Sequence, residues 1–167
     1  MGSIPINGSS FAFQTRAFFC IRRAPSRVLL KRMNERNEPE VVRSETEWRA
    51  RLGPERYHIL REAGTERPFT GSLLELTAEG RYLCGGCGAA LFTAEAKFES
   101  HCGWPSFTEP EELERVRLLE DHSHGMLRTE VRCKRCDSHL GHVFDDGPGP
   151  KRTRYCINSL SLDFQPK

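Results

Sequence analysis

The sequence predicts a mostly β domain with short helices at its N-terminal edge and a bound metal ion that holds it together. Beyond Gly71, short apolar runs alternate with Gly, Pro, Asp and Ser, which is typical of antiparallel strands. Two helix-start signals precede these runs. Two Cys-x-x-Cys pairs lie among them, in the pattern of a metal site. With 167 residues, the chain has the length of one domain and a tail.

The composition excludes two classes of protein. The chain is 37% hydrophobic and 29% charged, and no apolar run approaches the roughly 18 residues of a membrane helix. A formal net charge of only +2 gives no general surface for nucleic acid. We therefore expect a protein that binds neither membranes nor nucleic acid. We also expect it to act as a monomer.

Residues 1–33 form a separate basic tail. They contain no acidic residue, and their six cationic side chains are Arg16, Arg22, Arg23, Arg27, Lys31 and Arg32, so the remaining residues carry a net charge of −4. This composition resembles a mitochondrial or plastid transit peptide. Alternatively, Met33 begins a shorter bacterial chain, which would be cytoplasmic. In either case we expect the functional domain to span residues 34–167 and Cys20 to have no chemical role.

Two short helices are expected at the start of the domain. Ser44 followed by Glu47 predicts a capping box, and Gly53 should end the first helix. Pro54 suits the first position of a second helix, which Gly64 should stop. The apolar residues of the two helices are Trp48, Leu52, Tyr57, Ile59 and Leu60.

Strands are expected at residues 81–83, 90–92, 116–118, 126–131 and 143–144. A further strand is predicted over residues 154–164, where alternate residues share one face. On that face Arg154, Cys156 and Asn158 form a polar end, and Leu160, Leu162 and Phe164 continue as an apolar stretch suited to the core.

Four cysteines have the spacing of a tetrahedral zinc site. Cys84 and Cys87 form one Cys-x-x-Cys pair, and Cys133 and Cys136 form the other. Each pair can place two thiolates from one tight turn at two corners of a tetrahedron. An iron–sulfur cluster or two redox pairs are the alternatives. Because four thiolates leave no open position for a substrate, we expect one structural zinc ion per chain.

The domain has two cysteines outside this set, Cys102 and Cys156. Arg154 lies two residues from Cys156 on the same strand face, and a nearby guanidinium favours the reactive thiolate. The alternative is that Cys156 is a small buried hydrophobic residue, which is the usual role of a lone cysteine.

Two further segments carry candidate site residues. His139 and His142 would lie on opposite faces of a regular strand, but a bulge at Gly141 would turn both rings toward one pocket. Metal ligands or ordinary surface histidines are the alternatives. Trp104 lies two residues after Cys102, where it is either part of the core or the wall of a small apolar pocket.

Together these segments resemble the B-type methionine sulfoxide reductases over about residues 44–164. The matching segments, in order with both cysteine pairs, are residues 68–71, 102–107, 125–131, 139–144 and 154–159. The resemblance implies a fold of two antiparallel sheets with a structural zinc. It also implies reduction of the R epimer of methionine sulfoxide in proteins.

The resemblance implies a role for each matched residue. Cys156 corresponds to the nucleophile, which becomes a sulfenic acid, and Cys102 to the resolving thiol that forms a disulfide with it. Thioredoxin or a similar dithiol then reduces the disulfide. His139, His142 and Asn158 correspond to residues that orient the substrate and help to protonate the leaving oxygen. Trp104 corresponds to the aromatic residue that packs against the S-methyl group. Arg154 corresponds to an arginine near the catalytic thiol.

The chain departs from the family pattern in the loop before Arg154. Lys151-Arg152-Thr153 replaces the usual Gly-Leu, which makes the loop more basic. Leu160 and Asp163 stand where small and basic residues are common.

Two other classes of protein are alternatives to the enzyme. One is a zinc-ribbon-like binding module without catalysis. The other is a disulfide-exchange protein, whose redox thiols would normally share one Cys-x-x-Cys turn. Within the enzyme class, free methionine sulfoxide is an alternative substrate.

Overall fold

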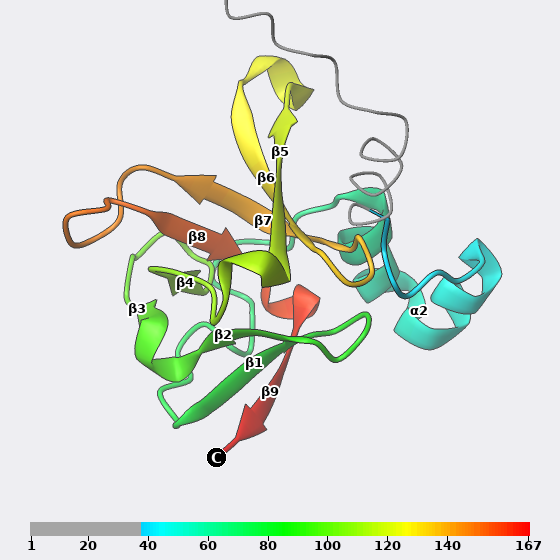
Figure 1. Cartoon of the computed structure of the whole chain (residues 1–167), viewed down its shortest axis with the longest axis horizontal. Coiled ribbons are helices and arrows are strands. Elements are labelled where there is room, and N and C mark those ends of the chain that lie inside the picture. The colour runs from blue at the N-terminus through cyan, green and yellow to red at the C-terminus, as the bar shows by residue number, and fades with distance from the viewer. Residues whose placement is uncertain (1–37) are drawn as a thin grey trace, which may run out of the picture. The chain divides into compact units, whose positions relative to one another are not determined.

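A computed structural model describes residues 38–167 (Figure 1). The predictions for the basic tail, including Cys20 and the two possible compartments, concern residues outside this described part. Within residues 38–167, no helix has the length and apolar character required to cross a membrane. The described chain is mainly β, as the sequence predicts.

The helical region is a single element, α2 (Glu45–Glu62), that is interrupted at Gly53. Ser44 and Glu47 form the predicted capping box. Gly53 has φ 68° and ψ 172°, so the segment consists of two helices joined at this residue, with Pro54 beginning the second. The second helix ends at Glu62, and its C-cap, Ala63, takes the left-handed conformation one residue before the predicted stop at Gly64.

The strands form two antiparallel sheets. The smaller has the order β2-β1-β9 and contains β1 (Gly80–Cys84), β2 (Ala90–Thr93) and β9 (Leu162–Pro166). The larger has the order β3-β4-β8-β7-β6-β5 and contains β3 (Lys97–Phe98), β4 (Ser106–Phe107), β5 (Val116–Asp121), β6 (Arg128–Cys133), β7 (His139–Phe144) and β8 (Arg154–Ile157). Short 3₁₀ turns are η1 (Ala94–Ala96), η2 (Leu113–Arg115), η3 (Ser123–Gly125) and η4 (Ser159–Ser161).

The single strand predicted over residues 154–164 is wrong. Strand β8 ends at Ile157, turn η4 follows, and β9 belongs to the other sheet. As a consequence Leu160 lies in the turn and is only partly buried, whereas Leu162 packs in the core. Alternation of apolar residues could not reveal the break, because the groups that hold η4 come from residues distant in the chain.

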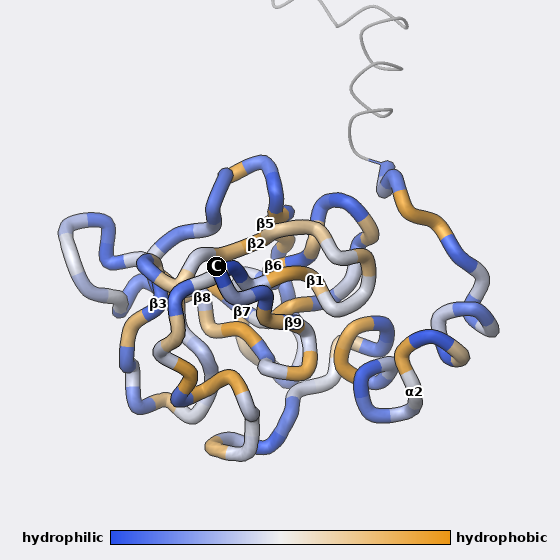
Figure 2. Tube along the Cα trace, turned by 90° about the horizontal axis from the view of Figure 1, so that it is seen from below, coloured by the Kyte–Doolittle hydropathy of each residue, from blue (hydrophilic) through white to orange (hydrophobic). Residues whose placement is uncertain are grey.

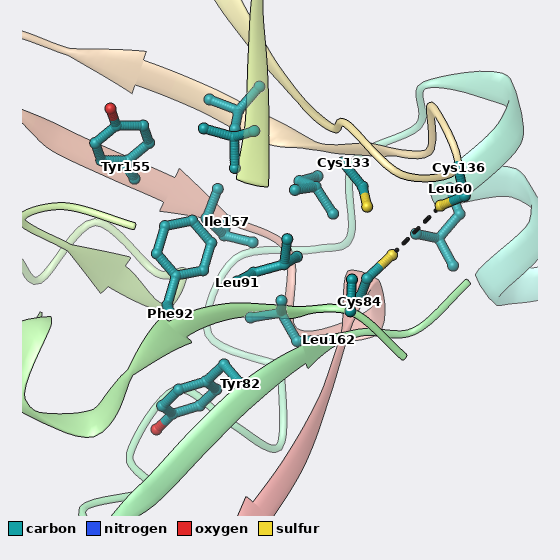
Figure 3. Packing of buried hydrophobic residues seen from close by; sticks show 14 of the residues in the cluster. Leu60, Tyr82, Cys84, Leu91, Phe92, Cys133, Cys136, Tyr155, Ile157 and Leu162 are labelled. Carbon is teal, nitrogen blue, oxygen red and sulfur yellow. Dashed lines mark hydrogen bonds between the residues drawn. The ribbon is translucent and has the colours of Figure 1, made fainter. Parts of the chain in front are cut away.

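The hydrophobic core lies between the two sheets and extends to α2. Hydrophobic residues gather toward the inside of the β domain, and hydrophilic residues follow its outer loops (Figure 2). Phe92 stacks on Phe107 with ring centroids 4.4 Å apart, and Tyr82 meets Phe107 edge-on. Leu91, Ile157 and Leu162 continue this packing toward the cysteine cluster (Figure 3).

Candidate active site

Cys102 and Cys156 lie next to each other despite the 54 positions that separate them in the chain. Their Sγ atoms are 3.7 Å apart, and both thiols are free. Cys156 is on β8, where its Cα partner on β4 is Ser106. Cys102 lies in the loop that leads into β4, and Ser100 Oγ donates a hydrogen bond to its Sγ at 3.0 Å. The pairing of β4 with β8 thus brings the two partly buried thiols side by side.

The surroundings of the two thiols shift their pKa values in opposite directions. Burial raises the pKa of the Cys156 thiol to about 12, with a further contribution from Cys102 and against the opposing effect of Arg154. Burial alone would also raise the pKa of Cys102, but hydrogen bonds with Ser100 and Ser106 outweigh it and lower that pKa. Arg154 therefore lowers the pKa of Cys156, as the sequence predicts, but its effect is smaller than the opposing effect of burial.

A bulge in β7 brings both histidines to one side of the sheet. The register between β6 and β7 shifts so that Leu140 has no Cα partner on β6. The His139 and His142 rings consequently meet edge-on with centroids 5.5 Å apart. Gly141 is required here, because a Cβ would overlap the carbonyl oxygen of Cys156. His142 is the Cα partner of Cys156 and lies directly across from the thiol.

Each histidine is held by a carboxylate that sequence reasoning did not assign to the site. His139 Nδ1 contacts Glu130 Oε1 at 2.6 Å, and His142 Nε2 contacts Asp121 Oδ2 at 2.8 Å. Burial opposes ionisation of Glu130, but hydrogen bonds with His139 and Arg132 lower its pKa. The pKa of Asp121 is also lowered, first by hydrogen bonds with Ser123.

An ionised carboxylate only accepts hydrogen bonds, so the bonded nitrogen of each ring must carry the proton. In the neutral rings, His139 Nε2 and His142 Nδ1 are therefore the free acceptors. His139 Nε2 is buried and has no hydrogen-bond partner within residues 38–167. Glu130 lies in segment 125–131, which matches the family pattern, but nothing in the sequence indicates that it contacts His139.

Replacing Asp121 by asparagine is expected to lower the pKa of His142 further. Burial already lowers this pKa, and the Asp121 carboxylate opposes that effect by stabilising the charged ring. A proton NMR titration of the ring resonances would measure the change. Glu120→Gln is the matched control, because Glu120 precedes Asp121 on β5 but is exposed and pairs with His122. An unchanged titration in Asp121→Asn would contradict the assigned contact.

Arg154 and Asn158 are both anchored. The Arg154 guanidinium donates to both Asp146 carboxylate oxygens, at 2.8 and 2.9 Å, and lies over the Phe144 ring at 4.7 Å. Asn158 is 3% exposed; its Nδ2 donates to Leu140 O at 3.0 Å, and its Oδ1 accepts from Glu66 N at 3.1 Å. The side-chain amide of Asn158 thus links β7 to the backbone of Glu66.

Trp104 forms part of a groove beside the Cys102 loop. Its indole Nε1 donates to Glu66 O at 3.1 Å, which fixes the ring. The groove encloses about 610 Å³, and its walls include Phe69, Leu74 and Pro105 together with Trp104. Phe69 is largely exposed. Cys102 and Cys156 are not among the lining residues, so the groove runs next to the thiols and does not contain them.

The other four cysteines of residues 38–167, Cys84, Cys87, Cys133 and Cys136, form a cluster that could hold a metal ion. Their Sγ atoms all lie within 4.8 Å of one another, with 3.7 Å between Cys87 and Cys133. Figure 3 shows Cys84 and Cys136, whose Sγ atoms are 3.6 Å apart, with Cys133 nearby. A tetrahedron with metal–sulfur bonds of about 2.3 Å has edges of about 3.8 Å, so these separations fit a tetrahedral ion. The cluster joins the turn after β1 to the turn after β6.

The chain matches a family model and many curated proteins. Residues 52–166 match the SelR domain. A protein of Thiobacillus denitrificans named peptide methionine sulfoxide reductase MsrB is 57% identical over 125 residues, which cover 75% of this chain and 95% of the relative. Proteins with the same name from Bradyrhizobium diazoefficiens and Methanosarcina barkeri are 53% and 56% identical, covering 78% and 75% of this chain and 94% and 88% of those relatives.

Proposed function

The chain belongs to the MsrB family of peptide methionine sulfoxide reductases and is an oxidoreductase that reduces methionine sulfoxide; we propose that it acts on the R epimer in oxidised proteins, through Cys156. The observation that carries this proposal is the pair of thiols, 3.7 Å apart, across from a carboxylate-bound histidine. A zinc-ribbon-like binding module would have no use for this arrangement.

In the first step, Cys156 Sγ attacks the sulfur of the sulfoxide. The S–O bond breaks, the thioether of methionine leaves, and the oxygen remains on Cys156 as a sulfenic acid. The sulfoxide gains two electrons, and the cysteine sulfur loses two. The proton of the thiol ends on the transferred oxygen, so the step needs no other reactant.

The histidines provide the path for that proton. Because the pKa of Cys156 is about 12, its thiol is protonated at neutral pH and needs a base. His142 lies across from Cys156 with Nδ1 free, so it accepts the thiol proton and donates it to the sulfoxide oxygen. His139, whose Nε2 is free and buried beside His142, hydrogen-bonds to the reacting oxygen or to water.

In the second step, Cys102 resolves the sulfenic acid. Its thiol attacks Cys156 Sγ, a disulfide forms, and water leaves with the transferred oxygen. The two sulfur atoms must approach by about 1.7 Å to reach a disulfide length of about 2.05 Å. A dithiol protein such as thioredoxin then reduces the disulfide and restores both thiols.

The remaining residues bind the substrate and maintain the fold. Trp104, fixed through its indole nitrogen, packs against the S-methyl group, and the adjoining groove accepts residues of the oxidised protein. Asn158, which is held by Leu140 O and Glu66 N, helps to orient the substrate, and Arg154, which is held by Asp146, stays near the catalytic thiol. The cysteine cluster holds one Zn²⁺, whose role is structural because four thiolates fill its coordination. The protein acts as a monomer.

The reaction can be tested with a peptide that contains resolved R or S methionine sulfoxide and with dithiothreitol as reductant. Mass spectrometry would count the reduced peptide. Loss of oxygen from the R epimer alone is the expected result. Equal loss from both epimers would contradict the proposed stereospecificity, and no loss from a folded sample would contradict the proposed reaction.

Replacing Cys102 by serine is expected to separate the two steps. The variant should still release one methionine per chain and then stop at the sulfenic acid, because the neighbouring thiol is gone. Thioredoxin-dependent turnover should fall by about 100-fold or more, since an intramolecular thiol acts at a very high effective concentration. Quenched-flow measurement of the first turnover would show the burst. Normal thioredoxin-dependent turnover would contradict the resolving role of Cys102.

A further inference from the structure

Glu66 is a buried charged residue in the loop between α2 and β1. It is only 8% exposed, and a buried carboxylate is costly unless hydrogen bonds satisfy it. Its Oε1 accepts from Ser159 N at 2.6 Å, and its Oε2 accepts from Leu160 N at 2.9 Å. Both N–H groups belong to η4, the turn that follows the strand of Cys156. The carboxylate therefore fastens the loop to the end of the catalytic strand.

The backbone of Glu66 holds two further side chains of the site. Its N–H donates to Asn158 Oδ1 at 3.1 Å, and its carbonyl accepts from Trp104 Nε1 at 3.1 Å. Asn158 lies two residues after Cys156, and Trp104 lies two residues after Cys102. Glu66 thus forms hydrogen bonds with both the segment that follows Cys156 and the segment that follows Cys102.

Close packing of the loop supports this arrangement. A Cβ on Gly71 would overlap the side chain of Ser159 and come close to Glu66 Oε1, so the loop can lie against η4 only with glycine at this position. Phe69 N donates to Gly103 O at 2.8 Å, which attaches the same loop to the Cys102 segment. The loop therefore touches both thiol-bearing segments.

We propose that Glu66 is a positioning residue for the reductase reaction: its carboxylate anchors the loop whose backbone sets Trp104 and Asn158 relative to the two thiols. The proposal rests on the proposed function for its kinetic consequences. Glu66 takes part in four hydrogen bonds that support this proposal, and each partner lies in a segment of the site.

Replacement of Glu66 by glutamine tests the carboxylate with almost no change in volume. The amide keeps one oxygen acceptor, but its NH₂ group faces a backbone N–H that also donates, so one of the two anchors is lost. We expect kcat/KM for a methionine sulfoxide peptide to fall by about 10- to 100-fold, with the larger part in KM, because small displacements of positioning groups have effects of this size. Glu66→Asp keeps the charge with a shorter reach and should lie between wild type and Glu66→Gln.

Arg56→Gln is the matched control. Arg56 Nε donates to Leu160 O at 2.9 Å, so it also holds η4, and its other polar partners are Leu162 O and Asp163 instead of Trp104 or Asn158. We expect this variant to unfold at a lower temperature and to keep kcat/KM within about twofold of wild type. If Glu66→Gln and Arg56→Gln lose activity equally, Glu66 only stabilises the turn and the proposal is overturned.

The indole N–H resonance of Trp104, assigned with a Trp104→Phe variant, provides a readout that does not depend on the reaction. It should shift in Glu66→Gln and stay unchanged in Arg56→Gln. An unmoved resonance in Glu66→Gln would overturn the positioning role even if activity falls. An inactive wild-type protein would instead overturn the proposed function, and the resonance would still decide whether Glu66 positions Trp104. If Glu66→Gln does not fold, Glu66→Asp is measured in the same way.

Discussion

Replacing Cys156 by serine is expected to abolish methionine sulfoxide reduction, with a loss of about 10⁴-fold or more. A serine hydroxyl is a much weaker nucleophile, and it cannot form a sulfenic acid or a disulfide. Because the side chain is nearly isosteric and Cys156 is only partly buried, the fold and the metal site should be unaffected. Methionine released in the first turnover, counted by mass spectrometry, measures the effect.

Cys102→Ser is the informative comparison, because the lowered pKa of Cys102 makes it the more acidic thiol of the pair. The proposal assigns the attack to Cys156, across from His142, and predicts that only Cys156→Ser eliminates the first methionine. The opposite result, a burst from Cys156→Ser and none from Cys102→Ser, would exchange the roles of the two cysteines.

Loss of the metal ion proposed for the cysteine cluster is expected to unfold the protein. Structural zinc contributes about 10–16 kcal/mol of apparent binding energy in small zinc domains, whereas whole domains are stable by only about 5–15 kcal/mol. Here the ion would join the turns that follow β1 and β6, so its removal separates elements of both sheets. Cys133→Ser should lose the metal and the cooperative thermal transition.

The measurement combines metal analysis with thermal denaturation followed by circular dichroism. Cys156→Ser is the control, since it makes the same substitution at a cysteine outside the cluster, and it should retain one zinc ion per chain and the wild-type midpoint. A Cys133→Ser protein that keeps a wild-type transition without metal would show that the ion is dispensable for folding. Another metal in the wild-type protein would contradict the assignment of zinc.

Local patterns in the sequence were sufficient for much of the fold. The capping box at Ser44 and Glu47, the interruption at Gly53 and the clustering of four cysteines all depend on residues close in the chain or on a strict spacing. The bulge beside Gly141 is also signalled locally, because glycine between two histidines marks a break in strand alternation.

The features that the sequence did not predict depend on contacts between distant residues. The turn η4 is held by Glu66, which precedes it by more than 90 positions, so strand alternation alone predicted an unbroken strand. Asp121 and Glu130 become partners of the histidines only once β5, β6 and β7 have paired. The high pKa of Cys156 follows mainly from burial, which the neighbouring Arg154 could not indicate.

The most direct test of the two-thiol mechanism uses the reduced wild-type protein without any reductant. Excess R methionine sulfoxide peptide is added, and the products are counted after the reaction stops. The two-thiol mechanism predicts one methionine per chain, the loss of two thiols, and a single disulfide that peptide mapping places between Cys102 and Cys156. Methionine formed without that disulfide, or a disulfide within the cysteine cluster, would contradict it.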